Sequence, residues 1–142
     1  MAIEVYIDGA ARGNPGPAGI GVVIKNGSQL VEEIGAYIGK ATNNMAEYLA
    51  LIRGLEEVVI RGFKSASFFS DSELLVKQLN GEYKVKHDNL VPLHYHALTL
   101  IDRMNQFSIK HVAREKNGHA DKMANYGIDI HSRTAPLLKL IK

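Results

Sequence analysis

The first hydrophobic segment of the chain leads directly into an acidic residue and a glycine-rich loop. It reads Ile3-Glu4-Val5-Tyr6-Ile7-Asp8-Gly9-Ala10-Ala11-Arg12-Gly13-Asn14-Pro15-Gly16-Pro17. Up to Asp8, aliphatic residues alternate with more polar ones, which is the pattern of a β-strand with two different faces. The segment that follows contains too much glycine and proline to continue as a helix or a strand. Asp8 is therefore predicted at the carboxyl end of a strand, where open α/β sheets bind their ligands.

The same loop offers backbone N–H groups and the amide of Asn14, with little side-chain bulk around them. Together with the Asp8 carboxylate, these groups are suited to a site where the carboxylate holds a metal ion and a large anion lies across that ion. The alternative is a surface turn after an edge strand, in which Asp8 only helps to form the turn. This stretch alone leaves both interpretations open.

Length and composition favour a single domain that spans residues 1–142. The chain is 46% hydrophobic, which is enough to bury a core, and it contains no cysteine. Disulfides and thiolate metal sites are therefore excluded, and a reducing cytoplasm is the expected location. No signal peptide or membrane span is indicated, so no membrane partner is expected.

The net charge of +2 comes from 17 basic and 15 acidic residues. If four of the acids are gathered at one metal site, 17 basic residues face 11 acidic ones, a balance of +6 over the rest of the chain. A basic surface around an acidic spot suits a protein that binds phosphate backbones and cuts them. A mildly basic soluble protein without such a partner is the alternative.

Turn signals and hydrophobic periodicity predict strands and helices along the whole chain. The expected strands are 3–8, 19–24, 30–38, 64–70 and 107–113, and the expected helices are 45–59, 73–79, 90–104 and 119–130, with a loop over 82–89. Asn26-Gly27 is a strong hairpin signal, so the first three strands should form an antiparallel meander. The order predicts an α/β fold with a five-stranded mixed sheet flanked by helices.

The tail from residue 131 to residue 142 carries four apolar side chains, namely Leu137, Leu138, Leu140 and Ile141. We expect it to dock on the body of a monomer and stabilise it. Burial against a partner chain is the alternative.

Four acidic residues lie where predicted elements meet. Asp8 and Asp71 end strands, whereas Glu47 and Asp121 lie in the first turns of helices. Each has a structural alternative: Asn44 and Glu47 match a capping box, Asp71 can cap the next helix, and Asp121 can face a helix dipole. Gathered in one place, the four carboxylates would repel one another unless cations were present. A ligand set made only of oxygens, with no cysteine thiolate, favours Mg²⁺ or Mn²⁺. Two such ions are suited to promote the attack of a nucleophile at phosphorus.

Four motifs in order carry a resemblance to the type 1 ribonucleases H. They are Tyr6-Ile7-Asp8-Gly9-Ala10 with Gly13-Asn14-Pro15-Gly16, Thr42-Asn43-Asn44-Met45-Ala46-Glu47, Ser70-Asp71-Ser72, and His111-Val112-Ala113-Arg114-Glu115 with Asn117 and Ala120-Asp121. Each motif is moderately specific, and all four in this order are highly specific. The resemblance covers the chain to about residue 130.

The resemblance implies a ribonuclease H-like fold and a metal site at Asp8, Glu47, Asp71 and Asp121. It implies that two Mg²⁺ or Mn²⁺ ions act with the substrate bound. The implied reaction is endonucleolytic cleavage of the RNA strand of an RNA/DNA hybrid, leaving 5′-phosphate and 3′-hydroxyl ends.

The resemblance also implies which residues contact the hybrid. The set consists of Gly9 and Ala11 through the backbone, Asn14 and Asn43 at the minor groove, Asn44 at the RNA, Thr42 at a DNA phosphate, and Glu73. Glu73 departs from the glutamine that many members carry, and a carboxylate accepts from a 2′-hydroxyl but cannot donate to it. A helix-surface acid is the alternative for Glu73, and helix capping is the alternative for the asparagines.

Two further departures concern loops. A short loop, Glu82–Asn89, stands where the best-known members carry a basic, tryptophan-rich protrusion, so Lys77, Lys84, Lys86 and His87 are candidates for phosphate contacts. The loop before Asp121 is also short, as in archaeal-like members, and this favours Arg114 as the auxiliary catalytic residue. His119 is the competing candidate because histidine titrates near neutral pH.

Three other functions compete with that of a hybrid-cutting enzyme. A non-catalytic hybrid-binding module would not need all four acids. An actin-like ATPase needs two duplicated domains, for which the chain is too short. A related metal nuclease that also acts on double-stranded RNA stays open.

Overall fold

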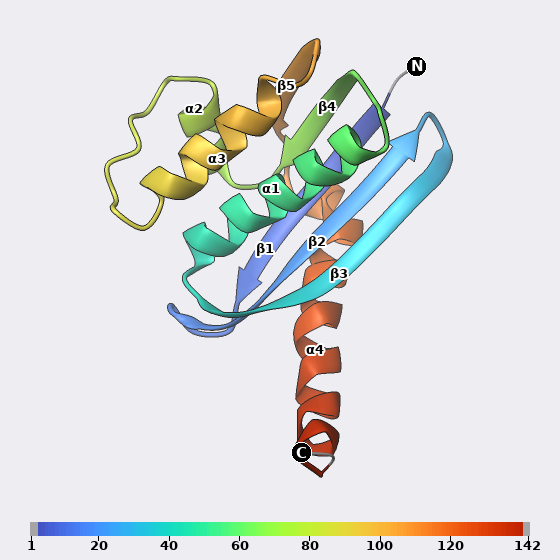
Figure 1. The fold of residues 1–142 in the computed structure, drawn as a ribbon, viewed down its shortest axis with the longest axis vertical. Helices are drawn as coiled ribbons and strands as arrows, with labels where there is room; N and C mark the ends of the chain where they lie inside the picture. The colour runs from blue at the N-terminus through green and yellow to red at the C-terminus, as the bar shows by residue number, and fades with distance from the viewer. Residues whose placement is uncertain (1–2, 141–142) are drawn as a thin grey trace.

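The chain folds into a five-stranded sheet with helices on both faces (Figure 1). The computed structural model describes residues 3–140, with side chains for residues 3–133. The strands are β1 (Ile3–Ala11), β2 (Gly16–Asn26), β3 (Gln29–Ala41), β4 (Ser65–Ser70) and β5 (Gln106–His111). The helices are α1 (Asn43–Ile60), α2 (Glu73–Leu79), α3 (Val91–Ile101) and α4 (Gly118–Leu140), with a 3₁₀ turn at Arg114–Lys116.

The strand order is β3-β2-β1-β4-β5. β1, β2 and β3 are antiparallel neighbours, whereas β4 pairs in parallel with both β1 and β5. This confirms the predicted mixed sheet with an antiparallel start. β1 is the central strand, so it pairs with β2 of the meander on one side and with β4 of the parallel part on the other.

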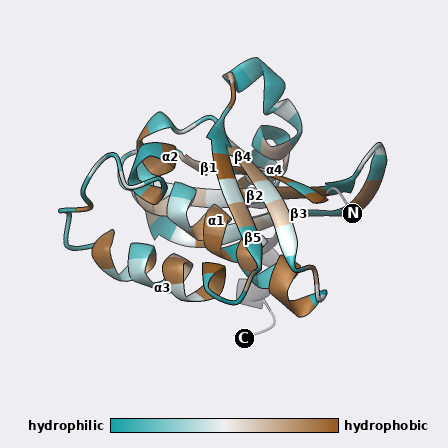
Figure 2. Cartoon of the chain, turned by 90° about the horizontal axis from the view of Figure 1, so that it is seen from above, coloured by the Kyte–Doolittle hydropathy of each residue, from teal (hydrophilic) through white to brown (hydrophobic). Residues whose placement is uncertain are grey.

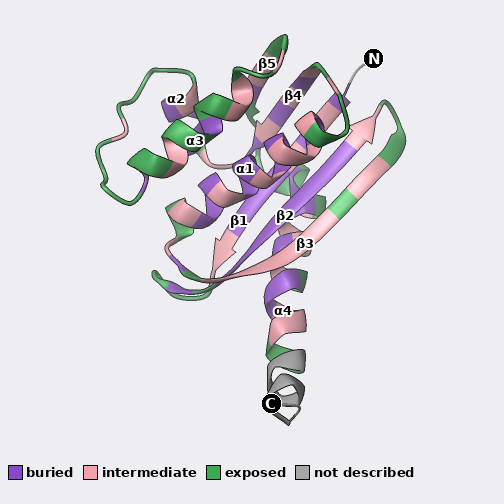
Figure 3. Ribbon diagram, viewed as in Figure 1, coloured by how far each residue is buried: buried purple, intermediate pink, exposed green. Residues whose placement is uncertain are grey.

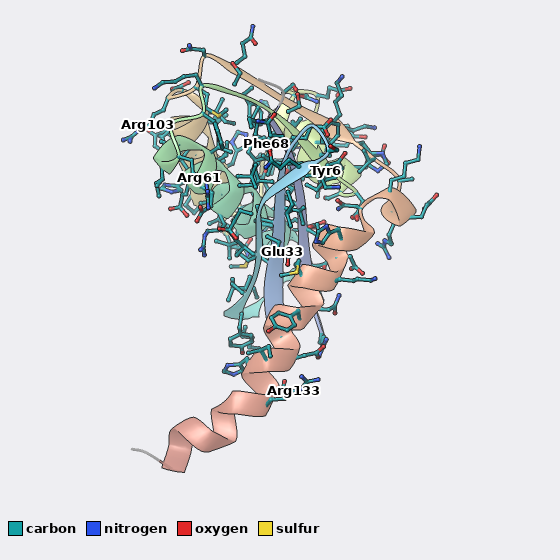
Figure 4. The ribbon with its side chains drawn as sticks, turned by 90° about the vertical axis from the view of Figure 1, so that its right-hand side faces the viewer. Tyr6, Glu33, Arg61, Phe68, Arg103 and Arg133 are labelled. Carbon is teal, nitrogen blue, oxygen red and sulfur yellow. The ribbon has the colours of Figure 1, made fainter. Side chains whose placement is uncertain are left out.

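The two faces of the sheet are covered by different helices. α1 packs on one face with α3 against it, and α4 crosses the other face over β2 and β3 (Figure 1). Phe68 lies on the α1 side and Tyr6 on the α4 side, as the alternation of a strand requires (Figure 4). Figure 3 shows the buried residues concentrated along β1, β2 and the inner side of α1.

Hydrophobic and hydrophilic residues alternate along α3 in the hydropathy view (Figure 2). Its Leu93, Leu100 and Ile101 pack against the core, whereas Tyr95 and Leu98 are exposed. Full burial of a side chain of this size contributes about 1.5–3 kcal/mol. These three side chains are partly buried, so each contributes part of that amount to holding α3 on α1.

The strand that carries Asp8 is longer than the sequence predicts. β1 stops pairing with β4 at Ile7 but continues to pair with β2 as far as Ala11, opposite Ala18. β2 accordingly begins at Gly16, and the glycine-rich loop is reduced to residues 12–15. Asp8 therefore lies at the end of the parallel part of the sheet and not at the end of its own strand.

The last helix is also longer than predicted, because it continues past Ile130 to Leu140. The prediction that the apolar side chains of the tail dock on the body concerns residues outside the described side chains. Among the helices of residues 3–140, none combines the length and the apolar character that a membrane crossing requires.

Candidate active site

Asp8 and Asp71 lie at the point where β1 and β4 part. The last parallel pair is Ile7 with Ser70, and each acid is the next residue along the chain. The carboxyl ends of neighbouring parallel strands meet at one edge of a sheet, so the two acids are brought together as predicted. Asp8 is only 6% exposed.

Glu47 reaches this edge from the first turns of α1. The helix is capped by Thr42, whose hydroxyl accepts from the Met45 N–H at 3.2 Å, so the alternative of a capping box between Asn44 and Glu47 is wrong. Glu47 Oε1 instead accepts a hydrogen bond of 2.5 Å from the Gly9 N–H. A side chain at Gly9 would overlap the backbone of Ala46, so the lack of one lets α1 come this close to β1.

Asp121 is brought to the site by a second close contact. Gly21 lies opposite Asp8 in the β1–β2 ladder, and a Cβ there would overlap the carbonyl oxygen of Ala120. The first turn of α4 therefore rests directly on the sheet beside Asp8. Asp121 and Asp8 line one pocket, and the Asp121 carboxyl group contributes to raising the pKa of Asp8.

Asp71 is held by a residue for which the sequence suggests no such role. The cap of α2 is Ser72, which accepts from the Leu75 N–H, so a capping role for Asp71 is wrong. The buried Asn117 donates from Nδ2 to Asp71 Oδ2 at 3.1 Å and to the Ile7 carbonyl at 2.9 Å. In the sequence, Asn117 belongs to the fourth motif and stands just before the last helix, and neither feature indicates a hydrogen bond to Asp71.

The acids thus converge from four separate elements. Ligand oxygens of Asp8, Glu47 and Asp71 all lie within 4.8 Å of one another. The pocket is completed by Gly9, Ala10, Ala11, Asn43, Arg114 and Asp121. Four carboxylates from four elements in one hollow are compatible with the binding of a divalent cation.

The electrostatics of the site point in the same direction. Burial, followed by the charges of Glu47, Asp71 and Asp121, raises the pKa of Asp8 to about 9. Burial likewise raises the pKa of Glu47 to about 8, although the Gly9 hydrogen bond and the Arg114 charge oppose the rise. Without a cation these carboxyl groups retain protons at neutral pH, and a divalent ion would displace them. The donors are all oxygens, which fits Mg²⁺ or Mn²⁺.

The residues expected to contact a nucleic acid surround the amino end of α1. Asn14 Oδ1 accepts from the Asn43 N–H at 3.0 Å, which ties the glycine-rich loop to the helix. This bond leaves the amide N–H groups of Asn14 as donors for a ligand. A second hollow beside the carboxylates is lined by Asn14, Thr42, Asn44, His87, Asn89 and Leu90. Glu73 lies on the surface of α2, where it pairs with Lys77 at 2.9 Å.

The two candidates for an auxiliary catalytic residue are separated by the fold. Arg114 lines the carboxylate pocket, and its charge acts on Glu47. His119 pairs with Glu33 on β3 at 2.6 Å, on the side of the sheet that α4 covers (Figure 4). His119 is absent from the residues that line the carboxylate pocket in the described part of the chain.

Comparison with known proteins gives a consistent result. The family described as "Reverse transcriptase-like" matches residues 6–127. The crystal structure of RNase H1 from Halobacterium salinarum has a TM-score of 0.87 and 42% sequence identity, covering 91% of this chain and 98% of that one. LC11-RNase H1, in complex with an RNA/DNA hybrid, has a TM-score of 0.85 and 44% identity, covering 89% of this chain and 96% of that one.

Relatives of similar length and longer relatives both occur. A ribonuclease H of Methylococcus capsulatus is 34% identical, and the match covers 89% of each chain. The chain spans only 38% of the length of mycobacterial relatives that include the bifunctional protein Rv2228c of Mycobacterium tuberculosis, at 39% identity over 95% of this chain. The similarity therefore extends over the whole sheet and all four acids, and the chain belongs to the type 1 ribonuclease H family.

Proposed function

We propose that this protein is an endonuclease that hydrolyses the RNA strand of RNA/DNA hybrids, leaving 5′-phosphate and 3′-hydroxyl ends. The observation that carries the proposal is the convergence of Asp8, Glu47 and Asp71, with Asp121 beside them, in one open pocket. A relative of 44% identity has been crystallised with an RNA/DNA hybrid, which supports the choice of substrate.

The four carboxylates would hold two Mg²⁺ or Mn²⁺ ions when the substrate is bound. When bound, such ions lower the pKa of a water nucleophile and neutralise charge on the departing 3′-oxygen. The protein holds the carboxylate ligands in position through hydrogen bonds. The Gly9 N–H orients Glu47, and Asn117 orients Asp71. An arginine side chain cannot act as a general acid or base, so the proposed role of Arg114 is to stabilise negative charge at the phosphate.

Selection of a hybrid follows from the groups beside the carboxylates. Only RNA offers a 2′-hydroxyl, which both donates and accepts in a shallow minor groove. The Asn14 amide and the backbone of Gly9 and Ala11 can pair with it without reading bases, so sequence preference should be weak. Thr42 and Asn44 line the adjoining hollow, which suits a backbone phosphate.

The test is an assay on four duplexes of one sequence: RNA/DNA with either strand labelled, double-stranded RNA, and double-stranded DNA. In Mg²⁺ or Mn²⁺ we expect internal cuts in the RNA of the hybrid only, with little sequence preference. Comparable cutting of double-stranded RNA would establish the broader metal nuclease. Binding of the hybrid without cutting in either metal would replace the enzyme by a non-catalytic module.

A further inference from the structure

A series of polar side chains connects the glycine-rich loop with the fourth carboxylate. Arg12 extends from this loop to α4, where Nη1 lies 2.7 Å from Asp129 Oδ1 and Nη2 donates to Asn125 Oδ1 at 3.2 Å. Asn125 in turn donates from Nδ2 to the Asp121 carbonyl at 3.0 Å and approaches Asp121 Oδ1 at 3.4 Å.

The order of these contacts fixes which end of the Asn125 amide faces Asp121. A side-chain amide has an acceptor end and a donor end, and either can turn toward a neighbour. Arg12 offers only donors, so it retains the oxygen of Asn125 on its own side. The Nδ2 donor is then left for Asp121, which as a carboxylate only accepts.

Stability alone does not account for this arrangement. The Arg12 and Asp129 side chains are 44% and 46% exposed, and ion pairs this exposed add little to folding stability. Their geometry matters more, because the pairing with Asp129 holds the Arg12 guanidinium against α4, where its second nitrogen reaches Asn125.

We propose that Asn125 is a positioning residue that holds the Asp121 carboxylate for a divalent cation, and that Arg12 and Asp129 set its orientation. The proposal rests on the metal site of the proposed function. Groups that orient a metal ligand through hydrogen bonds change metal affinity on the order of tenfold or more. Because Arg12 belongs to the loop that faces the hybrid, the same contacts connect that loop to the metal site.

The experiment measures Mn²⁺ binding to metal-free protein by electron paramagnetic resonance, together with kcat and KM on the hybrid and thermal unfolding. Asn125→Leu is similar in size but has no hydrogen-bonding groups, and Tyr126→Leu is its control at the next, exposed position of α4. Arg12→Ala alters only a surface side chain and leaves the Asn125 amide free to turn. The double variant combines Asn125→Leu with Arg12→Ala.

We expect Asn125→Leu to weaken Mn²⁺ binding about tenfold and Arg12→Ala about threefold, with the double variant no weaker than Asn125→Leu alone. kcat should fall with KM changed less than about twofold in Asn125→Leu, and Tyr126→Leu should match the wild type. Unchanged Mn²⁺ binding in a folded Asn125→Leu would overturn the proposal, as would equal effects of Tyr126→Leu. If the wild type binds Mn²⁺ but cuts no hybrid, the proposed function fails while the positioning role is still decided by Mn²⁺ binding.

Discussion

At the residue scale, the site is defined by carboxyl groups that the fold places in an unfavourable environment. Asp8 and Glu47 are each 6% exposed and lie beside other acids. Their raised pKa values mean that the folded protein binds protons there more tightly than the unfolded chain does. The stability that these protons provide is complete below about pH 4 and is lost as pH rises toward 8 to 9.

Asp8→Asn should therefore stabilise the metal-free protein at alkaline pH. One such group changes the free energy of unfolding by at most about 1.4 kcal/mol per pH unit. In EDTA at pH 8 we expect the variant to melt at least about 3 °C above the wild type, and at pH 4 the two should coincide. Calorimetry at both pH values measures this, and an equal difference at both would contradict it. Added Mn²⁺ should raise the melting temperature of the wild type only.

Arg114 lines the carboxylate pocket and His119 does not, so substitutions at the two positions should have different effects on kcat. Arg114→Ala should lower kcat about 10- to 100-fold, because it removes a positive charge from the carboxylate pocket. His119→Ala should change kcat less than about threefold, since His119 pairs with Glu33 outside that pocket. Steady-state rates on one hybrid decide this, and the reverse ranking would assign the auxiliary role to His119.

Hydrophobic patterning places the four acids near junctions between elements, and the resemblance to the type 1 ribonucleases H is what implies a metal site at these four. The sequence does not predict Asn117 or Asn125 in their positioning roles. Asn117 donates to a carbonyl 110 residues away, at Ile7, and no local pattern shows such a contact. The same holds for the caps: several polar residues stand before α1 and α2, and only the three-dimensional path of the chain selects Thr42 and Ser72.

At the element scale, the site depends on how closely two helices approach β1 and β2. Gly9 accommodates α1, and Gly21 accommodates the first turn of α4. The glycine pattern of β2 indicates only a buried strand, because the need for small residues arises from a helix about 100 positions later. Element bounds are predicted best for α2, which spans 73–79 as expected. The hairpin turn lies one residue later than the Asn26-Gly27 signal, at Gly27-Ser28, because Asn26 still pairs with Gln29.

Gly21→Ala should move α4 away from the sheet. Its Cβ would meet the Ala120 backbone, and overpacking of this kind costs about 1–3 kcal/mol. We expect a melting temperature lower by about 3–9 °C and a loss of activity, since Asp121 moves with the helix. Gly118→Ala is the control, because its Cβ would meet nothing within 4 Å, and it should be neutral or slightly stabilising. Equal effects of the two substitutions would refute the close-contact argument.

At the scale of the whole molecule, the balance of charged residues outside the site is basic. Once the four acids of the site are set aside, 17 basic residues face 11 acidic ones. Lys84 and Lys86 lie exposed in the loop between α2 and α3. The same loop contributes His87 and Asn89 to the hollow beside the amino end of α1. We expect these lysines to contact a backbone phosphate of the bound duplex.

The double variant Lys84→Ala/Lys86→Ala should bind the hybrid more weakly and with less dependence on salt. Removal of one phosphate contact lowers the slope of log affinity against log salt by about 0.7–0.9, so the slope should fall by about 1 to 2. Fluorescence anisotropy in EDTA measures binding without cleavage. Lys64→Ala/Arg103→Ala removes equal charge at the opposite end of β4 and should leave the slope unchanged. An unaltered slope in the loop variant would exclude that loop from phosphate contact.

The central claim is that the four carboxylates form one metal-dependent centre that cuts RNA. The most direct measurement is single-turnover cleavage of 5′-labelled RNA in a hybrid by the wild type and Asp8→Asn, in Mg²⁺, in Mn²⁺ and in EDTA. We predict internal cuts by the wild type in metal only, and at least a thousandfold slower cleavage by the variant at full hybrid occupancy. Cleavage in EDTA, or an Asp8→Asn variant as fast as the wild type, would contradict the account.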